Sequence, residues 1–242
     1  MPRFFVDAPG PGEYLLGGEA GRHGAKSLRL RPGEAVTLCD GQGMDYPSTV
    51  QEVLPDGLLL TVGEPVPNRA EARTEITLCH CLPKSDKLET VVQKSVELGV
   101  HSIWPIASAR CVSRWDSKSA EKKLARLQKI ALEAAQQSGR GIVPQILPPA
   151  ELSFALEAAA KEGNVLFFYE QGRASLKEAL QKAGGRLILF VGPEGGFEPG
   201  EAELAASLGA EILSLGPRIL RTETAPLAAL SAILYEKGDW EL

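Results

Sequence analysis

Two strand-like runs that each end in a glycine-bearing turn constrain the fold of this chain more than any other feature. The apolar run 187–191 (LILFV) leads into 192–197 (GPEGGF), and the run 212–215 leads into the glycine-bearing stretch 215–225. A strand without polar alternation is typical of a parallel sheet covered on both faces. Because ligands bind at the carboxyl ends of the strands in open α/β sheets, the two turns predict one shared pocket at that edge.

The two turns differ in what they offer a ligand. Glycines at 192, 195 and 196 can adopt positive φ and let a flat ligand approach the backbone, whereas Glu194 presents a carboxylate, so this turn is not an obvious anion site. After the second turn a helix is predicted, with Thr222 or Thr224 as its cap, Pro226 in its first turn and an apolar stripe from Leu227 onward.

Strands alternate with helices from about residue 68 to the end. Strands are predicted at 75–81, 102–106 and 164–168, and helices at 86–98 and 117–138. This alternation predicts an α/β fold with a mainly parallel sheet. The exit of the strand 164–168 is expected to form a third wall of the pocket.

Residues 1–67 have a different pattern, in which glycine and proline separate short β-like runs. These runs are 35–39, 46–50 and 57–62, with turn signals between them, and they predict a small β-barrel. The segment 64–69 contains two prolines and is the best linker. The expected domains are therefore 1–67 and 68–242.

Composition limits the classes of protein that remain. The chain has 242 residues, of which 44% are hydrophobic and 24% charged, as in an ordinary globular protein. Without a long apolar stretch or a signal-peptide pattern, we expect a cytoplasmic protein with no membrane association. Four cysteines without paired metal spacing are expected to be buried free thiols, and with only three histidines we expect no metal site.

The distribution of charge is uneven. The formal net charge is −5, yet residues 110–140 contain eight basic and three acidic side chains. This segment is either a phosphate-contacting face or a solvated helix face, and the sequence leaves both open. A second basic group lies in the N-terminal region, at Arg3, Arg22, His23, Lys26, Arg29 and Arg31.

At this point the chain resembles a known family. The pair GPEGGF (192–197) and LGPRILRTETA (215–225) is similar to the SPOUT methyltransferases, and most similar to the branch that methylates N3 of a uridine in small-subunit ribosomal RNA. Shorter matches lie at 87–89, 93–100, 108–111 and 136–140. Ala109 and Gln136 depart from the family pattern, which often has glutamate there, so neither position is given an acid or base role.

The resemblance implies a fold, a cofactor and partners. It implies a deep trefoil knot in the C-terminal domain, a PUA-like RNA-binding barrel in the N-terminal domain, S-adenosylmethionine as cofactor and ribosomal RNA as substrate. It also implies a homodimer, for which the alanine-rich helix near 225–236 offers a face, although packing within the subunit is equally compatible with that sequence.

Site residues follow from the three strand exits and the resemblance. The expected cofactor contacts are Leu166, Phe168, Gly192, Glu194, Gly196, Leu215, Gly216, Ile219, Leu220 and Ala225. For Leu166 and Phe168, ordinary core packing is the alternative. The expected RNA contacts are Arg3, Arg22, Arg29, Lys94, Arg110 and Arg140.

Uridine N3 carries a proton at neutral pH, so methylation there needs a base or a cation that stabilises the developing anion. Arg221 and Glu223 flank the second turn and are the catalytic candidates. Alternatively, they pair with each other and hold the turn. Three readings remain open: this uridine methyltransferase, a related enzyme acting on transfer RNA or on a ribose 2′-hydroxyl, or a catalytically silent RNA-binding protein.

Overall fold

The computed structural model describes residues 1–7 and 9–241, and the chain divides into two compact units. One comprises Met1–Glu71 and Ala135–Val143, and the other Ala72–Ala134 and Pro144–Leu242. The predicted boundary at 67/68 therefore differs from the observed division, because the later segment 135–143 belongs to the first unit. No helix in the described part of the chain is long and apolar enough to cross a bilayer.

Glu71 explains why the segment 135–143 joins the first unit. Its carboxylate accepts hydrogen bonds from the backbone N–H groups of Gly141 and Ile142 at 2.8 and 3.0 Å and from the guanidinium of Arg140 at 2.7 Å. The Asn68 amide also donates to the carbonyl of Gly139 at 3.0 Å. These contacts join residues about seventy positions apart. Sequence periodicity describes only local structure, so it could not predict them.

The first unit is built on a six-stranded sheet with the order β1-β3-β4-β5-β2, and β6 pairs with β4. Only the β1–β3 pair is parallel. The predicted strands 35–39 and 57–62 are confirmed, and 46–50 lies inside the longer β4. The elements are β1 (Arg3–Phe5), β2 (Gly12–Leu16), α1 (Gly18–Arg22), a π-helix (His23–Ser27), β3 (Ala35–Cys39), β4 (Met44–Leu54), β5 (Gly57–Val62) and β6 (Val66–Pro67).

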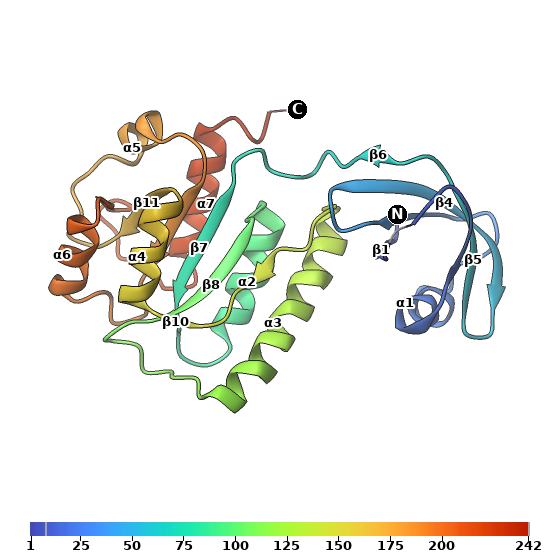
Figure 1. Ribbon diagram of the computed structural model, residues 1–242, viewed down its shortest axis with the longest axis horizontal. Coiled ribbons are helices and arrows are strands. Elements are labelled where there is room, and N and C mark those ends of the chain that lie inside the picture. The colour runs from blue at the N-terminus through green and yellow to red at the C-terminus, as the bar shows by residue number, and fades with distance from the viewer. Residues whose placement is uncertain (8, 242) are drawn as a thin grey trace. The chain divides into compact units, whose positions relative to one another are not determined.

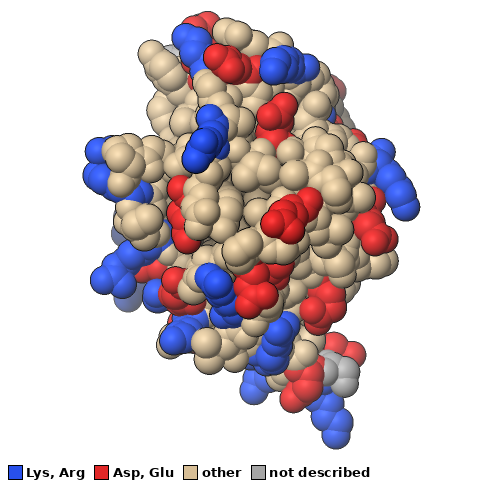
Figure 2. Space-filling model, turned by 90° about the vertical axis from the view of Figure 1, so that its left-hand side faces the viewer, with Lys and Arg blue, Asp and Glu red and all other residues tan. Residues whose placement is uncertain are grey.

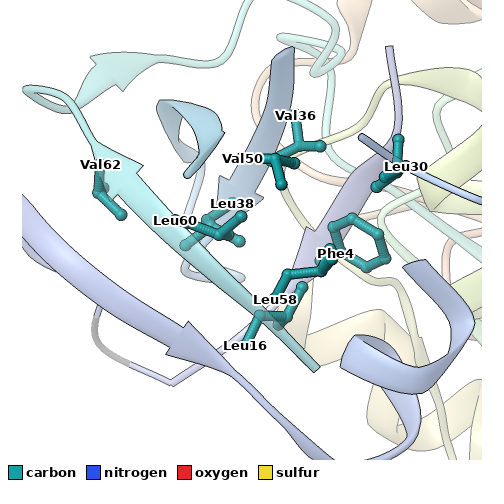
Figure 3. Packing of buried hydrophobic residues seen from close by; sticks show 9 residues of the cluster. All are labelled: Phe4, Leu16, Leu30, Val36, Leu38, Val50, Leu58, Leu60 and Val62. Atoms are coloured by element: carbon teal, nitrogen blue, oxygen red, sulfur yellow. The ribbon is translucent and has the colours of Figure 1, made fainter. Parts of the chain in front are cut away.

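An apolar cluster fills the inner face of this sheet (Figure 3). Leu58, Leu60 and Val62 are alternate residues of β5 and belong to this cluster, and Leu58 lies beside Phe4 of β1 and Leu16 of β2. Each fully buried side chain of this size contributes about 1.5–3 kcal/mol. Burial of one strand face therefore fixes the register of a unit that is otherwise rich in glycine and charge.

The second unit contains a seven-stranded parallel sheet with the order β10-β8-β7-β12-β11-β13, and β9 pairs with β8. The prediction of an α/β fold with a parallel sheet is confirmed. The central strands β7 and β12 are buried along their whole length, as the unbroken apolar run of β12 predicts, although β7 also buries the polar Thr77 and His80. The strands are β7 (Ile76–Cys81), β8 (Ser102–Ala107), β9 (Gln145–Ile146), β10 (Ala150–Glu151), β11 (Asn164–Phe168), β12 (Leu187–Val191) and β13 (Glu211–Leu213).

Helices cover this sheet (Figure 1). Helix α2 packs against α7, and α4 contacts β8, β10 and β11. Gly99 ends α2 with a φ of 102°, a conformation that glycine adopts without a steric cost. The helices are α2 (Lys87–Leu98), α3 (Ser117–Ser138), α4 (Leu152–Glu162), α5 (Leu176–Lys182), α6 (Pro199–Ser207) and α7 (Ala225–Glu236).

The predicted start of α7 is right in position but wrong in its capping interaction. Thr224 is the N-cap residue, yet its side chain makes no capping hydrogen bond. The hydroxyl of Thr222 donates instead to the carbonyl of Gly192 at 2.9 Å. A long-range contact between two turns has therefore replaced the local cap that the sequence pattern favoured.

The four cysteines are all buried and free, as predicted. Among the described residues, no cluster of three or more His, Cys, Asp and Glu side chains is placed to hold a metal ion. Figure 2 shows basic and acidic side chains interspersed with uncharged ones on one face of the molecule. This face therefore carries no continuous region of a single sign.

Candidate functional site

A cavity of about 360 Å³ lies at the carboxyl edge of the parallel sheet in the second unit. Its walls come from the end of β11, from residues 192–197 after β12 (the first turn) and from residues 215–221 after β13 (the second turn). The predicted shared pocket is thus present, with a volume in the range of small-molecule sites.

The first turn is packed firmly from behind. The Phe197 side chain is only 1% exposed, and its ring centroid lies 4.2 Å from that of Phe167. A Cβ on Gly192 would lie 3.2 Å from the Phe197 ring, and Gly196 has a φ of 68° beside the carboxylate of Glu170. Glycine at these two positions therefore leaves the backbone accessible from the cavity while the aromatic side chain fills the core side.

The second turn is exposed along most of its length. Gly216 has a φ of 97°, and the Ile219 side chain is 84% exposed. No hydrogen bond joins residues 217–220 to any other residue that the structure describes. An apolar side chain so exposed beside a cavity is a ready contact for a ligand.

Thr222 anchors the end of the second turn. It is 5% exposed, its hydroxyl binds the Gly192 carbonyl, and its own carbonyl lies 2.9 Å from Nε2 of the buried His80. The other ring nitrogen of His80 lies 2.7 Å from the carbonyl of Cys81. Burial lowers the pKa of His80, so the ring is neutral at pH 7 and donates from one nitrogen. His80 and Thr222 together tie the second turn to β7 and to the first turn.

Lys87 links the two turns by charge. Its Nζ lies 3.1 Å from Glu194 Oε1 in the first turn and 3.2 Å from Glu223 Oε2 just after the second turn. The hydrogen bond to Glu194 is the main reason why the pKa of Lys87 is raised. A backbone hydrogen bond, and then Lys87, lower the pKa of Glu223. One ammonium therefore sits between two ionised carboxylates over a wide pH range.

Glu194 is held from a second side as well. Its carboxylate accepts the backbone N–H of Lys84 at 3.1 Å. Burial alone would raise its pKa, but backbone hydrogen bonds and Lys87 bring it below the ordinary value. A carboxylate stabilised in this way is a poor proton acceptor near neutral pH.

The third wall depends on a glycine. Gly172 follows β11, and a Cβ at this position would lie 2.5 Å from the backbone of Leu213 in β13. Such a distance cannot be relieved by moving a side chain, so the bend at 172 must approach β13 without one. The adjoining Tyr169 and Glu170 line the cavity.

Nine of the ten predicted cofactor residues line the cavity: Phe168, Gly192, Glu194, Gly196, Leu215, Gly216, Ile219, Leu220 and Ala225. Leu166 does not, because it lies two residues before the end of β11 and is 1% exposed in the core. Strand residues two apart share a face but are separated by about 6.6 Å along the strand, so only Phe168 reaches the edge.

The two catalytic candidates lie differently from each other. Arg221 lines the cavity and is exposed, and its guanidinium forms no ion pair with any described residue. Glu223 does not line the cavity; its ion pair is with Lys87, and Arg221 makes only a minor coulombic contribution to the lowering of its pKa. Pairing between Arg221 and Glu223, the alternative offered by the sequence, is therefore not the arrangement found.

The predicted RNA contacts are scattered. Arg22 and Arg29 are exposed in the first unit, whereas Arg3 pairs with Asp45 at 2.9 Å. Arg140 is 3% exposed and bound to Glu71, a position that suits a structural role. In the second unit, Lys94 pairs with Glu97 at 2.8 Å, and Arg110 donates to the Gly195 carbonyl at 3.0 Å and so supports the first turn.

Sequence reasoning did not assign Lys87 to the pocket, whereas Glu170 and Arg218 lie in segments that were predicted to form its walls but were not named as cofactor contacts. The lysine at the first position of α2 carries no periodic signal, since helix starts often have charged residues. Glu170 belongs to the exit of the strand 164–168 and Arg218 lies inside the second turn, so naming every residue of the predicted walls would have included them.

Comparison with known proteins assigns the chain to a class. Residues 70–234 match the family model described as RNA methyltransferase domain, and the chain belongs to this family.

Relatives within the class are more specific. Ribosomal RNA small subunit methyltransferase E of Bacillus subtilis (strain 168) is 36% identical over 99% of this chain and 100% of its own length. The protein of the same name from Mycobacterium bovis is 32% identical over 98% and 93%. A crystal structure of ribosomal RNA small subunit methyltransferase E from Neisseria gonorrhoeae, bound to S-adenosylmethionine, has a TM-score of 0.89 and 34% identity, covering 97% of each chain.

Proposed function

We propose that this chain transfers a methyl group from S-adenosylmethionine to N3 of a uridine in small-subunit ribosomal RNA. The observation that carries the proposal is the cavity between the two turns, which joins backbone-accessible glycines to an unpaired arginine. The name of the relatives from three bacteria and the S-adenosylmethionine bound to one of them support it.

The cavity fits this cofactor. Gly192, Gly196 and Gly216 would leave backbone groups free to bind the edge of an adenine ring, and Ile219 and Leu220 would cover its apolar face. Glu194 and Glu170 add carboxylates that suit a cofactor carrying ammonium and sulfonium charges. When bound, the cofactor supplies an already activated methyl group. The protein therefore has to align that methyl group with the uracil N3 and to assist the loss of the N3 proton.

Arg221 is the residue that we assign to the chemistry. Loss of the N3 proton places negative charge on the uracil, and an unpaired guanidinium at the cavity stabilises that charge as it develops. Glu223 and Glu194 are held ionised with lowered pKa values, so they are positioning groups for Lys87 and the turns. The proton then leaves to solvent at the open side of the cavity.

Arg221→Ala separates this role from cofactor binding. Removing one group that stabilises charge only in the transition state costs about 100-fold or more in turnover. We expect kcat to fall by that order while the affinity for S-adenosylhomocysteine in calorimetry changes less than threefold, because the exposed side chain does not support the fold. Arg221→Lys keeps the charge and should retain part of kcat. Equal turnover by Arg221→Ala would remove the residue from the mechanism.

Three finer features belong to the same proposal. The chain after the second turn forms a trefoil knot, which the anchoring of Thr222 against Gly192 supports. The first unit is a PUA-like RNA-binding barrel, supported by its exposed Arg22 and Arg29. The protein is a cytoplasmic homodimer, for which the exposed Tyr235 on the final helix offers a contact.

Base mapping tests the function directly. Small subunits that lack the modification are incubated with the protein and S-adenosylmethionine, and the RNA is digested and analysed for modified nucleosides. We expect N3-methyluridine at a single position. A 2′-O-methylated nucleoside, or methylation of transfer RNA in place of the subunit, would overturn the assignment. Failure of the protein to bind S-adenosylhomocysteine would favour a silent RNA-binding protein.

A further inference from the structure

A second, smaller cavity of about 90 Å³ lies beside the first in the second unit. The two cavities are lined by neighbouring residues at the start of α2, since Ser85 and Asp86 line the smaller cavity and Lys87 lines the larger one. The neighbouring Lys84 donates its backbone N–H to Glu194. A polymer with one residue in the larger cavity can therefore reach the smaller one along this short segment.

Trp115 also lines the smaller cavity. It lies on the loop between β8 and α3, which begins at the edge where the parallel strands end (Figure 1). The ring is half-buried, and the Nζ of Lys123 lies 5.0 Å from its centroid. Trp104, by contrast, donates its indole N–H to the Pro148 carbonyl. The indole N–H of Trp115 finds no protein acceptor among the described residues, so the side chain is not held as a core tryptophan would be.

A row of cations continues from Trp115 along α3. Lys118, Lys122 and Arg126 are four residues apart, hence about 6 Å apart along the helix, and Lys129 continues the same face. Arg126 pairs with Glu89 at 2.6 Å, whereas the three lysines have no ion-pair partner within the described residues. Two acidic residues, Glu121 and Glu133, lie on the same helix, so the excess is positive.

A lysine-rich helix alone is usually a solvated face. Here it is continuous with a half-buried indole and a cavity that adjoins the pocket, and this combination suits only one class of ligand. Single-stranded nucleic acid offers bases that stack on aromatic rings and phosphates that pair with a line of cations. An acidic protein segment would use the lysines and leave the indole without a partner.

We propose that Trp115, Lys123 and the lysines of α3 form a subsite for single-stranded RNA next to the nucleotide held in the larger cavity. A flanking base stacks on the indole in place of the Lys123 ammonium, and the following phosphates run along Lys118, Lys122 and Lys129. This inference rests on the proposed function, because it takes RNA as the substrate.

The test measures binding of the full-length protein to a labelled single-stranded oligoribonucleotide that contains one uridine flanked by purines. Stacking on an aromatic side chain is worth about tenfold in affinity per base, so Trp115→Ala should weaken binding roughly tenfold while Trp115→Phe retains most of it. The salt dependence supplies a second measurement. For single strands the slope of log K against log salt changes by about 0.7 per phosphate contact, so Lys118→Gln with Lys122→Gln should reduce it by roughly 1.4.

A matched control uses lysines from other helices. Lys161 of α4 and Lys182 of α5 are exposed as well, and their double glutamine variant should keep the slope of the parent protein. In turnover assays Trp115→Ala should raise KM with kcat unchanged. Far-UV circular dichroism and urea unfolding show whether each variant is folded, and Trp115→Phe keeps the test decisive if the alanine variant is not.

Several outcomes would overturn the subsite. These are unchanged RNA affinity in both Trp115 variants, an unchanged salt slope in the α3 double variant, or displacement of the RNA by polyglutamate as effectively as by unlabelled RNA. The affinity for S-adenosylhomocysteine is measured in parallel. If the parent protein binds it and Trp115→Ala binds it equally, a failure of the RNA experiment concerns the subsite alone, whereas a parent protein that does not bind it contradicts the proposed function.

Discussion

The two turns that form the pocket are made of similar residues but are supported in opposite ways. The first turn is anchored in the core by its own Phe197, and the Arg110 guanidinium donates a hydrogen bond to one of its carbonyls. Its Glu194 carboxylate binds the backbone N–H of Lys84 and the ammonium of Lys87. Among the residues that the structure describes, the second turn is hydrogen-bonded only near its ends, where the hydroxyl of Ser214 accepts from the backbone N–H of Gly216 and Thr222 donates to Gly192, and its middle is exposed.

This difference indicates that the two turns contribute to different properties of the protein. A wall that is already packed in the free protein adds no entropic cost of ordering when the ligand binds. An exposed wall makes its contacts only with the ligand, so its ordering opposes binding. We therefore expect mutations in the first turn to change folding stability and mutations in the second turn to change affinity.

The largest effect is expected for Phe197→Ala. Truncating a buried phenylalanine costs about 3–5 kcal/mol in the free energy of unfolding, because both transfer and cavity contributions are lost. Urea unfolding followed by circular dichroism measures it. The matched change Ile219→Ala in the second turn should stay within about 0.5 kcal/mol of the parent protein. Similar losses in the two variants would contradict the contrast between the turns.

Ile219→Ala should act on affinity instead. A ligand that covers this side chain buries apolar surface worth about 1.5–3 kcal/mol for a whole residue, so the truncation should weaken S-adenosylhomocysteine binding about tenfold. Isothermal titration calorimetry provides the measurement. Val112→Ala is a suitable control, because Val112 is also highly exposed but does not line the cavity. Unchanged binding by Ile219→Ala would show that the second turn does not close on the ligand.

Lys87→Met tests the link between the turns. Without the ammonium two carboxylates face each other, so we expect about fivefold weaker binding of S-adenosylhomocysteine, with Lys87→Arg close to the parent protein. S-adenosylmethionine carries an additional positive charge that the extra negative charge favours, so its affinity should fall less. If Lys87 had only a structural role, the affinities for both ligands would fall equally, and that result would contradict the electrostatic role.

The smallest effect concerns pH. Because burial lowers the pKa of His80 in the folded protein, the unfolded chain takes up a proton first as the pH falls below about 6.5, and the free energy of unfolding decreases. One proton limits the slope to about 1.4 kcal/mol per pH unit. His80→Gln should flatten this slope between pH 7 and pH 5. Chemical denaturation at several pH values provides the measurement, and an identical slope in the parent protein and the variant would contradict the assignment.

Much of the second unit could be predicted because its pattern is strong. The strands 164–168 and 187–191 and the helix 117–138 agree with β11, β12 and α3, since unbroken apolar runs and a long helical stripe leave little choice. The strand predicted at 212–215 ends at Leu213, because Ser214 turns to bind Gly216. The short helices and the π-helix in the glycine-rich first unit left no comparable signal.

The turns that form the site could be predicted from the sequence, but the ion pairs between its charged side chains could not. Glycine turns after strands revealed most of the lining, but Lys87 meets Glu194 and Glu223 only in three dimensions. Similarly, Arg140 belongs to a basic segment in the sequence and is nevertheless buried against Glu71. Local pattern identifies which elements reach the edge, whereas the pairing of ionised groups depends on how those elements pack.

Gly172 has a consequence for how the sequence can vary. Its missing side chain lets the bend after β11 lie directly on the backbone of β13, and no other amino acid fits that contact. Gly200, in α6, has open space where a Cβ would stand and an ordinary φ. Under random mutagenesis with selection for folded protein, position 172 should admit almost no replacement and position 200 many, so two glycines that look alike in the sequence differ sharply in their mutational tolerance.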